Sequence, residues 1–395
     1  MDKGDSLYIE IDGKDFVELL RKISLEFKIK SYIVGGFIRD YLLGVKNFDI
    51  DVVVEGDGVE FANLLSRYLE GDIVIHEAFR TVTLTYKNIS IDVISARKEY
   101  YDYPAVLPRI EFSNIYDDLA RRDFTINTLA YDVVENKFID YFNGIQDLKT
   151  GVIRILHSKS FIDDPTRIFR AIRYSVRYSF AIESETERLL KESIDKIRLL
   201  TPDRIRNELF LILKEDKAKE MIEKVIYYGI DKIVFGDVSI NTKNLDYFEN
   251  SDIDIVLYRF LILFYLIKEK DLIKIKESLN ISSLYLKSLE DLIFLCKQLK
   301  CKDKNVRKIR LTLQTTKKEV IKAISTMENG EAQRIVNTKL YITGEDIKNL
   351  GLKPSPLYGE LMDKLFEAKM KGLLNNKEEE IEFAKKLIEQ LKKGE

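Results

Sequence analysis

The chain has 395 residues, of which 45% are apolar, so it is long enough to bury the cores of two to four domains. Its 64 Lys and Arg residues are balanced by 66 Asp and Glu residues, and a net charge of −2 gives no overall sign of nucleic-acid binding. The apolar segments are short and interrupted by charges, and two cysteines and two histidines are too few for a disulfide framework or a zinc site, so we expect a soluble cytoplasmic protein without zinc and without membrane insertion.

The first part of the chain alternates between helix and strand patterns. Apolar residues at helical spacing predict an amphipathic helix over residues 16–27, which leads into an apolar strand at 32–34. The same patterns predict a helix at about 59–69 and strands near 73–76, 81–86 and 89–95. Residues 97–113 have no clear period, so we expect a long loop there, of a kind that is often functional.

The segment 32–54, which reads YIVGGFIRDYLLGVKNFDIDVVV, combines a glycine turn with two acids. Gly35 and Gly36 allow backbone N–H groups to approach an anion, and the short helix that follows adds the positive end of its dipole. Asp49 and Asp51 lie two residues apart in a strand, so both carboxylates point to the same side. The segment therefore predicts a phosphate site beside a metal site, with Mg²⁺ as the expected ion.

A third acid, Asp92, lies between apolar residues in the strand pattern SIDVISA. An Asp-x-Asp pattern alone is weak, but carboxylates within an apolar strand cost desolvation that a bound cation would offset. Asp49, Asp51 and Asp92 could together hold two metal ions, one activating an attacking hydroxyl and the other neutralising the leaving group. The alternative for Asp92 is an acid on a solvated edge strand.

Helical patterns dominate the remainder of the chain. A helix is predicted over residues 117–132, and a strand–turn–strand unit over 138–155. Further helices are expected at 165–178, 185–197 and 202–213, and then repeatedly to the end. A turn at 351–356 precedes two final helices and indicates a boundary near residue 335.

Five segments in order carry a resemblance to a known family. They are GGFIRDYLLG with the following DID, ARRDFTINTLAYD (120–132), DYFNGIQDLKTGVIR (140–154), DDPTRIFRAIRYSVRYSF (163–180) and LTPDRIRNEL (200–209). Together they resemble the motifs of the DNA polymerase β-like nucleotidyltransferases, specifically the class II tRNA nucleotidyltransferases and bacterial poly(A) polymerases. Thr128 replaces the usual alanine and Asp163 the usual glutamate, while residues 342–361 resemble the C-terminal segment of such enzymes.

The resemblance implies an α+β protein with a polymerase β-like mixed-sheet catalytic head followed by an all-helical neck, body and tail. The expected parts are the head at 1–155, a neck with base recognition at 156–215, the body at 216–335 and the tail at 336–395. Body and tail would hold the tRNA elbow.

Base recognition falls, by the same resemblance, to Asp164 and Arg167. Adenine and cytosine both offer an amino donor next to a ring-nitrogen acceptor, so one acid and one arginine can accept either base. The two side chains are three residues apart on one helical face, where an ordinary ion pair is the alternative.

Other polar residues are assigned around the nucleotide. The resemblance places Arg122 and Asp123 at the ribose and nucleotide with Asn127 in support, although a salt-bridged amphipathic helix is the alternative. Arg39, Arg170 and Arg173 are expected at phosphates, or else in local ion pairs. A basic stripe containing Lys304, Arg307 and Lys308 is the candidate RNA surface, or else a solvated helix face.

The function implied is template-independent addition of C and A, or of A alone, to the 3′ end of tRNA from CTP and ATP, with release of pyrophosphate. The partners would be ATP, CTP and the 3′ end and elbow of tRNA. A poly(A) polymerase is the alternative enzyme, and a tRNA-binding protein without catalysis is the alternative of a different class. The motifs do not distinguish full CCA addition from addition of the terminal A.

Overall fold

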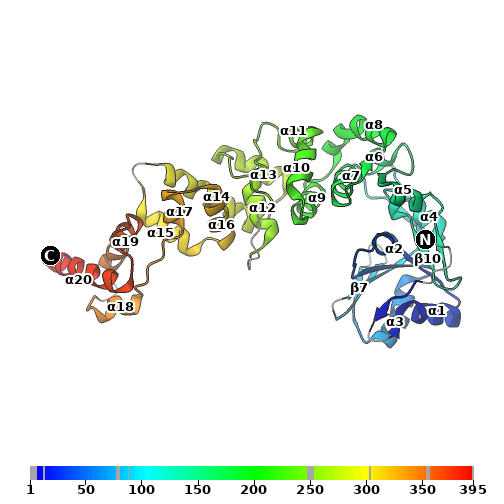
Figure 1. Ribbon diagram of the computed structural model, residues 1–395, viewed down its shortest axis with the longest axis horizontal. Helices are drawn as coiled ribbons and strands as arrows, with labels where there is room; N and C mark the ends of the chain where they lie inside the picture. Colours follow the sequence, from blue (N-terminus) through cyan, green and yellow to red (C-terminus); the bar gives the residue numbers. More distant parts are fainter. Residues whose placement is uncertain are drawn as a thin grey trace. The chain divides into compact units, whose positions relative to one another are not determined.

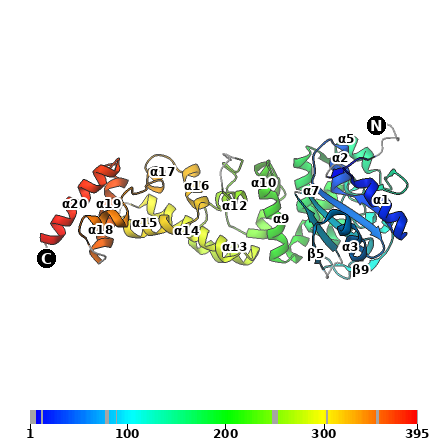
Figure 2. The same cartoon turned by 90° about the horizontal axis from the view of Figure 1, so that it is seen from below.

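The computed structural model describes residues 7–11, 14–76, 81–87, 89–246, 253–301, 304–352 and 356–393. The chain divides into two compact units, residues 1–200 and 201–395, and Figure 1 and Figure 2 show the elements of each. The division into head, neck, body and tail stays a prediction. Residues 353–355 of the expected C-terminal turn lie outside the described residues.

A mixed seven-stranded sheet forms the centre of the first unit, in the order β11-β10-β3-β4-β7-β6-β5. Its strands are β3 (Lys30–Val34), β4 (Asp49–Glu55), β5 (Asp72–His76), β6 (Thr81–Tyr86), β7 (Ile89–Ser95), β10 (Ala130–Asp132) and β11 (Lys137–Ile139). Strands β4 and β7 run parallel, whereas the other neighbouring pairs are antiparallel. Helices α1 (Phe16–Phe27) and α3 (Gly58–Leu69) pack against each other and against this sheet.

Strand β4 lies inside the sheet with both faces covered for most of its length. Val52, Val53 and Val54 are fully buried, as expected for a central strand. Val53 packs in one cluster with Ile115 and Leu119 of α4 (Ile115–Ala120). Because side chains alternate along a strand, Asp49 and Asp51 share the face of Val53, and they lie at the beginning of the strand, where the chain is exposed and then half-buried.

Most elements of the first unit agree with their sequence patterns. The predicted helix at 59–69 and the strands at 73–76, 81–86 and 89–95 are confirmed to within about one residue. Asp15 and Asp57 cap α1 and α3 by accepting hydrogen bonds from backbone N–H groups of the first turn. Helix α7 (Thr166–Arg177) confirms the pattern at 165–178.

Three sequence predictions are wrong in detail. The expected helix at 117–132 ends at Ala120, and a short 3₁₀ helix η2 (Thr125–Asn127) and strand β10 follow, because Phe124 pairs with Ile155 and β10 pairs with β3 and β11. The expected strand–turn–strand unit contains helix α5 (Gly144–Thr150) before β12 (Val152–Ile153). The expected loop at 97–113 contains the antiparallel strands β8 (Arg97–Tyr100) and β9 (Arg109–Phe112).

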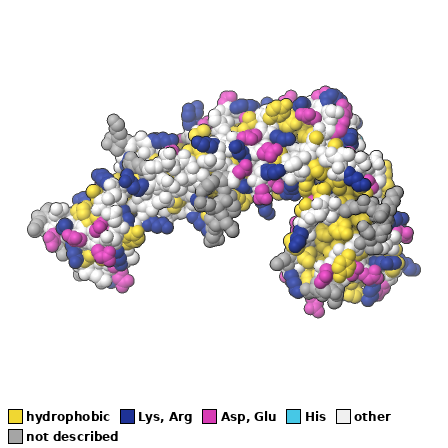
Figure 3. Space-filling view, viewed as in Figure 1, with side chains coloured by type: hydrophobic (Ala, Val, Ile, Leu, Met, Phe, Trp, Pro, Cys, Tyr) yellow, Lys and Arg dark blue, Asp and Glu magenta, His cyan; other side chains and the backbone are white. Residues whose placement is uncertain are grey.

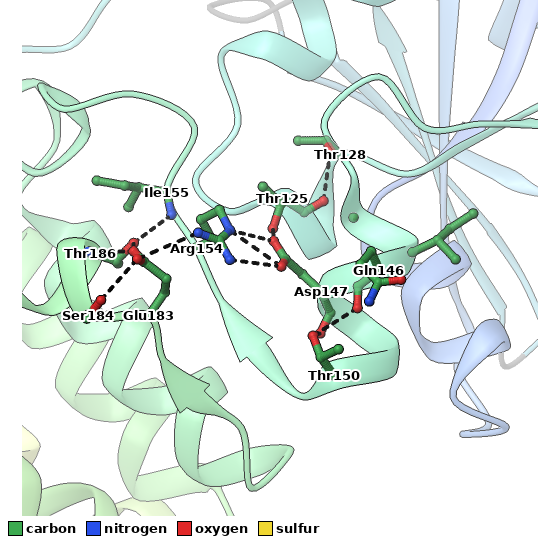
Figure 4. Close-up of polar contacts among 12 residues, drawn as sticks. Thr125, Thr128, Gln146, Asp147, Thr150, Arg154, Ile155, Glu183, Ser184 and Thr186 are labelled. Carbon is green, nitrogen blue, oxygen red and sulfur yellow. Dashed lines mark hydrogen bonds and ion pairs between the residues drawn. The ribbon is translucent and has the colours of Figure 1, made fainter.

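A polar network, shown in Figure 4, fixes α5 and β12 to the helices that follow. The buried carboxylate of Asp147 accepts hydrogen bonds from Thr125 Oγ1 at 2.6 Å and from Arg154 Nε at 3.1 Å. Arg154 also lies 3.7 Å from Glu183, which caps α8 (Ser184–Ser193) through Thr186. Glycine is required at 144, since a Cβ atom there would lie 2.3 Å from the Thr125 carbonyl oxygen.

The first unit also contains several short elements. They are β1 (Glu10–Ile11), β2 (Lys14–Asp15), α2 (Gly36–Leu42), α6 (Ser160–Asp163), β13 (Ala181–Ile182) and η3 (Ile194–Leu199). Strand β13 pairs in parallel with β12.

The second unit is helical throughout its described residues. Its helices are α9 (Pro202–Lys214), α10 (Ala218–Tyr227), α11 (Ile230–Phe235), α12 (Ile255–Leu263), η4 (Glu269–Asp271), α13 (Leu272–Leu279), α14 (Ser283–Lys300), α15 (Val306–Thr315), α16 (Lys318–Met327), α17 (Glu331–Val336), α18 (Gly344–Asn349), α19 (Pro356–Met370) and α20 (Lys377–Lys393). The largely apolar α12 packs against α9, α14 and α16. Its buried Arg259 donates to the carbonyl oxygens of Leu213 and Glu215 at the end of α9.

Helices α18, α19 and α20 share an apolar cluster of their own around Ile347, Leu361, Leu365 and Ala384. Glu380 is fully buried beside this cluster, where it accepts the N–H groups of Tyr341 and Ile342 and pairs with Lys369. No helix within the described ranges is long and apolar enough to cross a membrane.

Candidate active site

The three predicted acids lie on one face of two parallel neighbouring strands. Asp51 of β4 is directly opposite Asp92 of β7, and Asp49 is opposite Ser90. Because residues two apart share a face, the three carboxylates project to the same side of the sheet. Asp92 lies in an inner strand and not at the edge of the sheet, and its Oδ1 accepts a hydrogen bond from Thr83 Oγ1 at 2.6 Å.

Asp51 is costly to ionise at this position. Burial raises the pKa of Asp51 to about 6; the charges of Asp92 and Asp49 add to the rise, while Arg122 opposes it. Across the part of the chain that the structure describes, no three His, Cys, Asp or Glu side chains are arranged so that they could hold a metal ion. The acids therefore share a face without forming a closed metal cage.

The side chain of Arg122 lies against the glycine turn at Gly35. Gly35 has a positive φ of 67°, and a Cβ atom there would lie 2.3 Å from Arg122 Nη1, so only glycine fits. The backbone N–H of Gly35 donates to the Leu129 carbonyl at 2.8 Å, which corrects the expectation that this N–H would face an anion. The role expected of Gly36 stays a prediction.

Arg39 is buried within a network of its own. Its Nε lies 2.9 Å from Asp40 Oδ1, and its Nη1 donates to Asn127 Oδ1 at 2.6 Å. Its guanidinium also lies 5.3 Å from the ring centre of Tyr174 and 4.8 Å from that of Tyr178. Of the two interpretations drawn from the sequence, the structure shows the local bridge, while a phosphate contact by Arg39 stays a prediction.

Asp123 is the centre of a second network that joins η2 to α7. Its Oδ1 accepts from Asn127 Nδ2 at 2.8 Å, and its Oδ2 accepts from Arg170 Nε at 2.6 Å. Burial alone would raise the pKa of Asp123, but Arg170, Asn127 and Arg167 together lower it to about 2. Asp123 is therefore ionised at neutral pH, and Arg170 is paired with it.

The two residues predicted to recognise the base lie at the beginning of α7. Asp164 accepts hydrogen bonds from the N–H and the hydroxyl of Thr166, and its backbone adopts an extended conformation between α6 and α7. Arg167 is buried and donates to Ser160 Oγ and to the Arg121 carbonyl, each at 2.7 Å. A guanidinium has five N–H groups, so Arg167 is held in place with donors to spare.

The structure adds Tyr174 to the residues considered from the sequence. Arg39, Arg170 and Arg173 each lie within 5.4 Å of its ring centre, and Arg170 Nη2 donates to its hydroxyl at 3.0 Å. Arg173 is buried, and its Nε has no hydrogen-bond partner among the described residues. Tyr174 lies within the motif segment 163–180, but its contacts with the arginines come from three-dimensional packing.

The predicted RNA-binding residues lie at the beginning of α15. Arg307 and Lys308 are exposed, Lys304 is half-buried, and Lys308 Nζ lies 4.5 Å from the ring centre of Phe294. Figure 3 shows Lys and Arg side chains distributed over the visible face of the helical unit and not gathered in one patch. The role of these three residues in RNA binding stays a prediction.

Two family models match the chain. Residues 31–154 match "Poly A polymerase head domain", and residues 179–239 match "Probable RNA and SrmB- binding site of polymerase A". The first match contains the three acids, the glycine turn, Asp123 and Asn127, whereas Arg170 lies outside both matches.

Two curated relatives are similar over nearly the whole chain. An A-adding tRNA nucleotidyltransferase of Halalkalibacterium halodurans is 30% identical over 95% of the chain and 93% of its own length. An A-adding tRNA nucleotidyltransferase of Geobacter sulfurreducens is 32% identical over 94% of the chain, which spans only 46% of that relative's length.

Solved structures of similar proteins cover both units. The CCA-adding enzyme of Thermotoga maritima in complex with tRNA is 30% identical, covers 95% of this chain and 94% of its own, and gives a TM-score of 0.71. A CCA-adding enzyme in complex with ATP is 31% identical, covers 96% of this chain and 95% of its own, and gives a TM-score of 0.74.

Proposed function

Because the chain belongs to the family of tRNA nucleotidyltransferases and bacterial poly(A) polymerases, we propose that it transfers AMP from ATP to the 3′ end of tRNA and releases pyrophosphate. The observation that carries the proposal is the register between β4 and β7, which brings Asp49, Asp51 and Asp92 to one face beside the glycine turn. Both curated relatives described above are named as A-adding enzymes. We place the reaction in the cytoplasm, where tRNA and ATP meet.

Magnesium is the ion that fits the three acids, because all their donor atoms are carboxylate oxygens. Because the three acids form no closed set of ligands in the described part of the chain, Asp49, Asp51 and Asp92 would hold it together with phosphate oxygens of the nucleotide. When bound, it would lower the pKa of the attacking ribose hydroxyl and neutralise charge on the phosphates. The raised pKa of Asp51 supports this assignment, since burial of an ionised carboxylate beside two others is costly until a cation shares the site.

The protein's own residues would orient the nucleotide. Asp123, ionised and fixed by Asn127 and Arg170, can accept hydrogen bonds from ribose hydroxyls. Asp164 and Arg167 would recognise the base: the acid accepts the amino group, and a spare N–H of the guanidinium donates to the ring nitrogen. Since Arg167 is already held by two hydrogen bonds, little conformational entropy would be lost when a base binds.

Full CCA addition is the second candidate. It is favoured by the similarity of both units to CCA-adding enzymes solved with tRNA and with ATP, and by a recognition pair that suits cytosine as well as adenine.

The experiment supplies purified protein with tRNA transcripts that lack the terminal A, CA or CCA, together with labelled ATP, CTP or both, and sequences the products. Addition of one A to the transcript that ends in CC, without use of CTP, supports the A-adding proposal. Incorporation of C identifies the CCA-adding activity, and long A tails identify a poly(A) polymerase. Binding of tRNA with no incorporation would refute catalysis, and Asp49→Asn with Asp51→Asn gives the inactive control.

A further inference from the structure

A buried acid beside the candidate site, Asp118, belongs to none of the five motif segments. Asp118 lies in the short helix α4 and is fully buried. Its Oδ1 accepts from Arg121 Nε at 3.0 Å and Nη2 at 2.7 Å, and its Oδ2 accepts from Arg122 Nη2 at 3.1 Å. We call Asp118 with these two arginines the carboxylate clamp.

The clamp brings together two side chains that would otherwise diverge. Consecutive residues at a helix end point in different directions, so Arg121 and Arg122 do not face each other by local geometry. A buried carboxylate is stable only when it is paired, and here two cations pair with one acid. Burial would raise the pKa of Asp118, but Arg121 and Arg122 hold it below its usual value, so the acid stays charged at neutral pH.

The two arms of the clamp differ in what they do. Arg121 also donates to Glu99 at 3.0 Å, and its carbonyl oxygen accepts from Arg167, so its contacts hold together β8, α4 and α7. Arg122 crosses the turn at Gly35 and, within the described ranges, makes one further hydrogen bond, at 3.4 Å to the Asn127 carbonyl. Its Nε is buried without a hydrogen-bond partner among the described residues.

We propose that Asp118 is a positioning residue that holds Arg122 over the glycine turn, with its spare donor available to the phosphates of the incoming nucleotide. The proposal rests on the proposed function, in which a nucleoside triphosphate binds beside Asp51. A guanidinium with unused N–H groups suits a phosphate oxygen, because it can donate two parallel hydrogen bonds. Without the carboxylate of Asp118, the side chain of Arg122 would be free to move toward ionised Asp51 and to form an ion pair with it.

The test measures equilibrium binding of ATP by calorimetry, in EDTA and without tRNA, so that it does not depend on turnover. Asp118→Asn should weaken ATP binding about tenfold, the effect of one lost charge-assisted contact. Arg122→Met should weaken it by a similar factor, and the double variant should be no weaker than either single variant. Glu380→Gln, which alters another fully buried carboxylate, is the matched control and should keep the affinity of the unaltered protein.

ATP binding by Asp118→Asn at the unaltered affinity would overturn the proposal, and so would a double variant in which the two losses multiply. If Asp118→Asn does not fold by circular dichroism, Asp118→Glu decides, because it keeps the charge: affinity within about threefold of the unaltered protein is expected, and a loss as large as that of Arg122→Met refutes the clamp. Absence of ATP binding by the unaltered protein would instead refute the proposed function.

Discussion

Replacing Asp51 with asparagine should stabilise the metal-free protein at neutral pH while it abolishes nucleotide transfer. Burial and the neighbouring acids raise the pKa of Asp51 to about 6, whereas an aspartate in an unfolded chain ionises near pH ~3.9. A difference of about 2 pH units corresponds to about 3 kcal/mol that the folded state loses when Asp51 is charged. Asparagine has nearly the same shape and no charge, so the variant avoids this cost.

The direction of the pKa shift of Asp51 determines how the stability difference between the unaltered protein and the variant depends on pH. Below pH ~3.9, Asp51 is protonated in both the folded and the unfolded chain, and the substitution should be neutral. As pH rises through about 6, the unaltered protein loses stability relative to the variant, and the difference is complete above pH ~7. For a unit of about 200 residues, 3 kcal/mol corresponds to a rise in Tm of roughly 6–12 °C at most.

Calorimetry in EDTA at pH 7.5 and pH 4.5 measures this difference. The matched control is Asp49→Asn, because Asp49 is exposed and should release little desolvation cost. Added Mg²⁺ should raise the Tm of the unaltered protein, because the bound cation offsets the negative charge of Asp51. It should not raise the Tm of Asp51→Asn, which lacks that charge. No gain at pH 7.5, or an equal gain at pH 4.5, would refute the reasoning.

Three further substitutions probe separate parts of the chain. Asp123→Asn removes the buried charge that pairs with half-buried Arg170 and should cost about 2 kcal/mol in urea unfolding at pH 7, with the cost disappearing as pH falls toward 2, where the native carboxyl is itself protonated. An unchanged unfolding midpoint at pH 7 would contradict this expectation. Gly144→Ala should destabilise by about 1–3 kcal/mol because its Cβ would meet the Thr125 carbonyl at 2.3 Å, whereas Gly359→Ala, with open space around it, should be neutral or stabilising. Lys304→Glu with Lys308→Glu should lower the slope of log Kd for tRNA against log salt by roughly 1–2, and an unchanged slope would remove these residues from the RNA surface.

The acids of the candidate site could be predicted because their signal is local. An alternation of Asp49, Ile50 and Asp51 fixes which side chains share a face, whatever the rest of the chain does. The pairing of Asp51 with Asp92 required the order of strands in the sheet, which depends on a parallel crossover and is not a local property. The sequence alone therefore suggested three acids but could not establish that they are neighbours.

The errors lie where distant segments decide the backbone. Residues 117–132 have a helical pattern, yet Ala130 pairs with Val34 and Ile139 in the sheet, and these contacts outweigh a local preference. The network around Arg39 also depends on a distant segment, while the phosphate contact expected of Arg39 stays a prediction. Its partner Asn127 is 88 residues away, and no local pattern could place the two side chains together.

The pairing of the arginines separates those that support the site from those that can bind an anion. Arg39 is paired with Asp40 and Arg170 with Asp123, so their charge is already balanced within the protein. Arg122 shares the carboxylate of Asp118 with Arg121, so one acid balances two cations there. Arg122 and Arg173 also each have a buried Nε without a hydrogen-bond partner in the described part of the chain. A nucleoside triphosphate brings several negative charges, and a buried guanidinium donor is costly until it is paired. The phosphates would therefore accept hydrogen bonds from Arg122 and Arg173. Arg39 and Arg170 instead fix the helix after the glycine turn and Asp123 in position relative to α7.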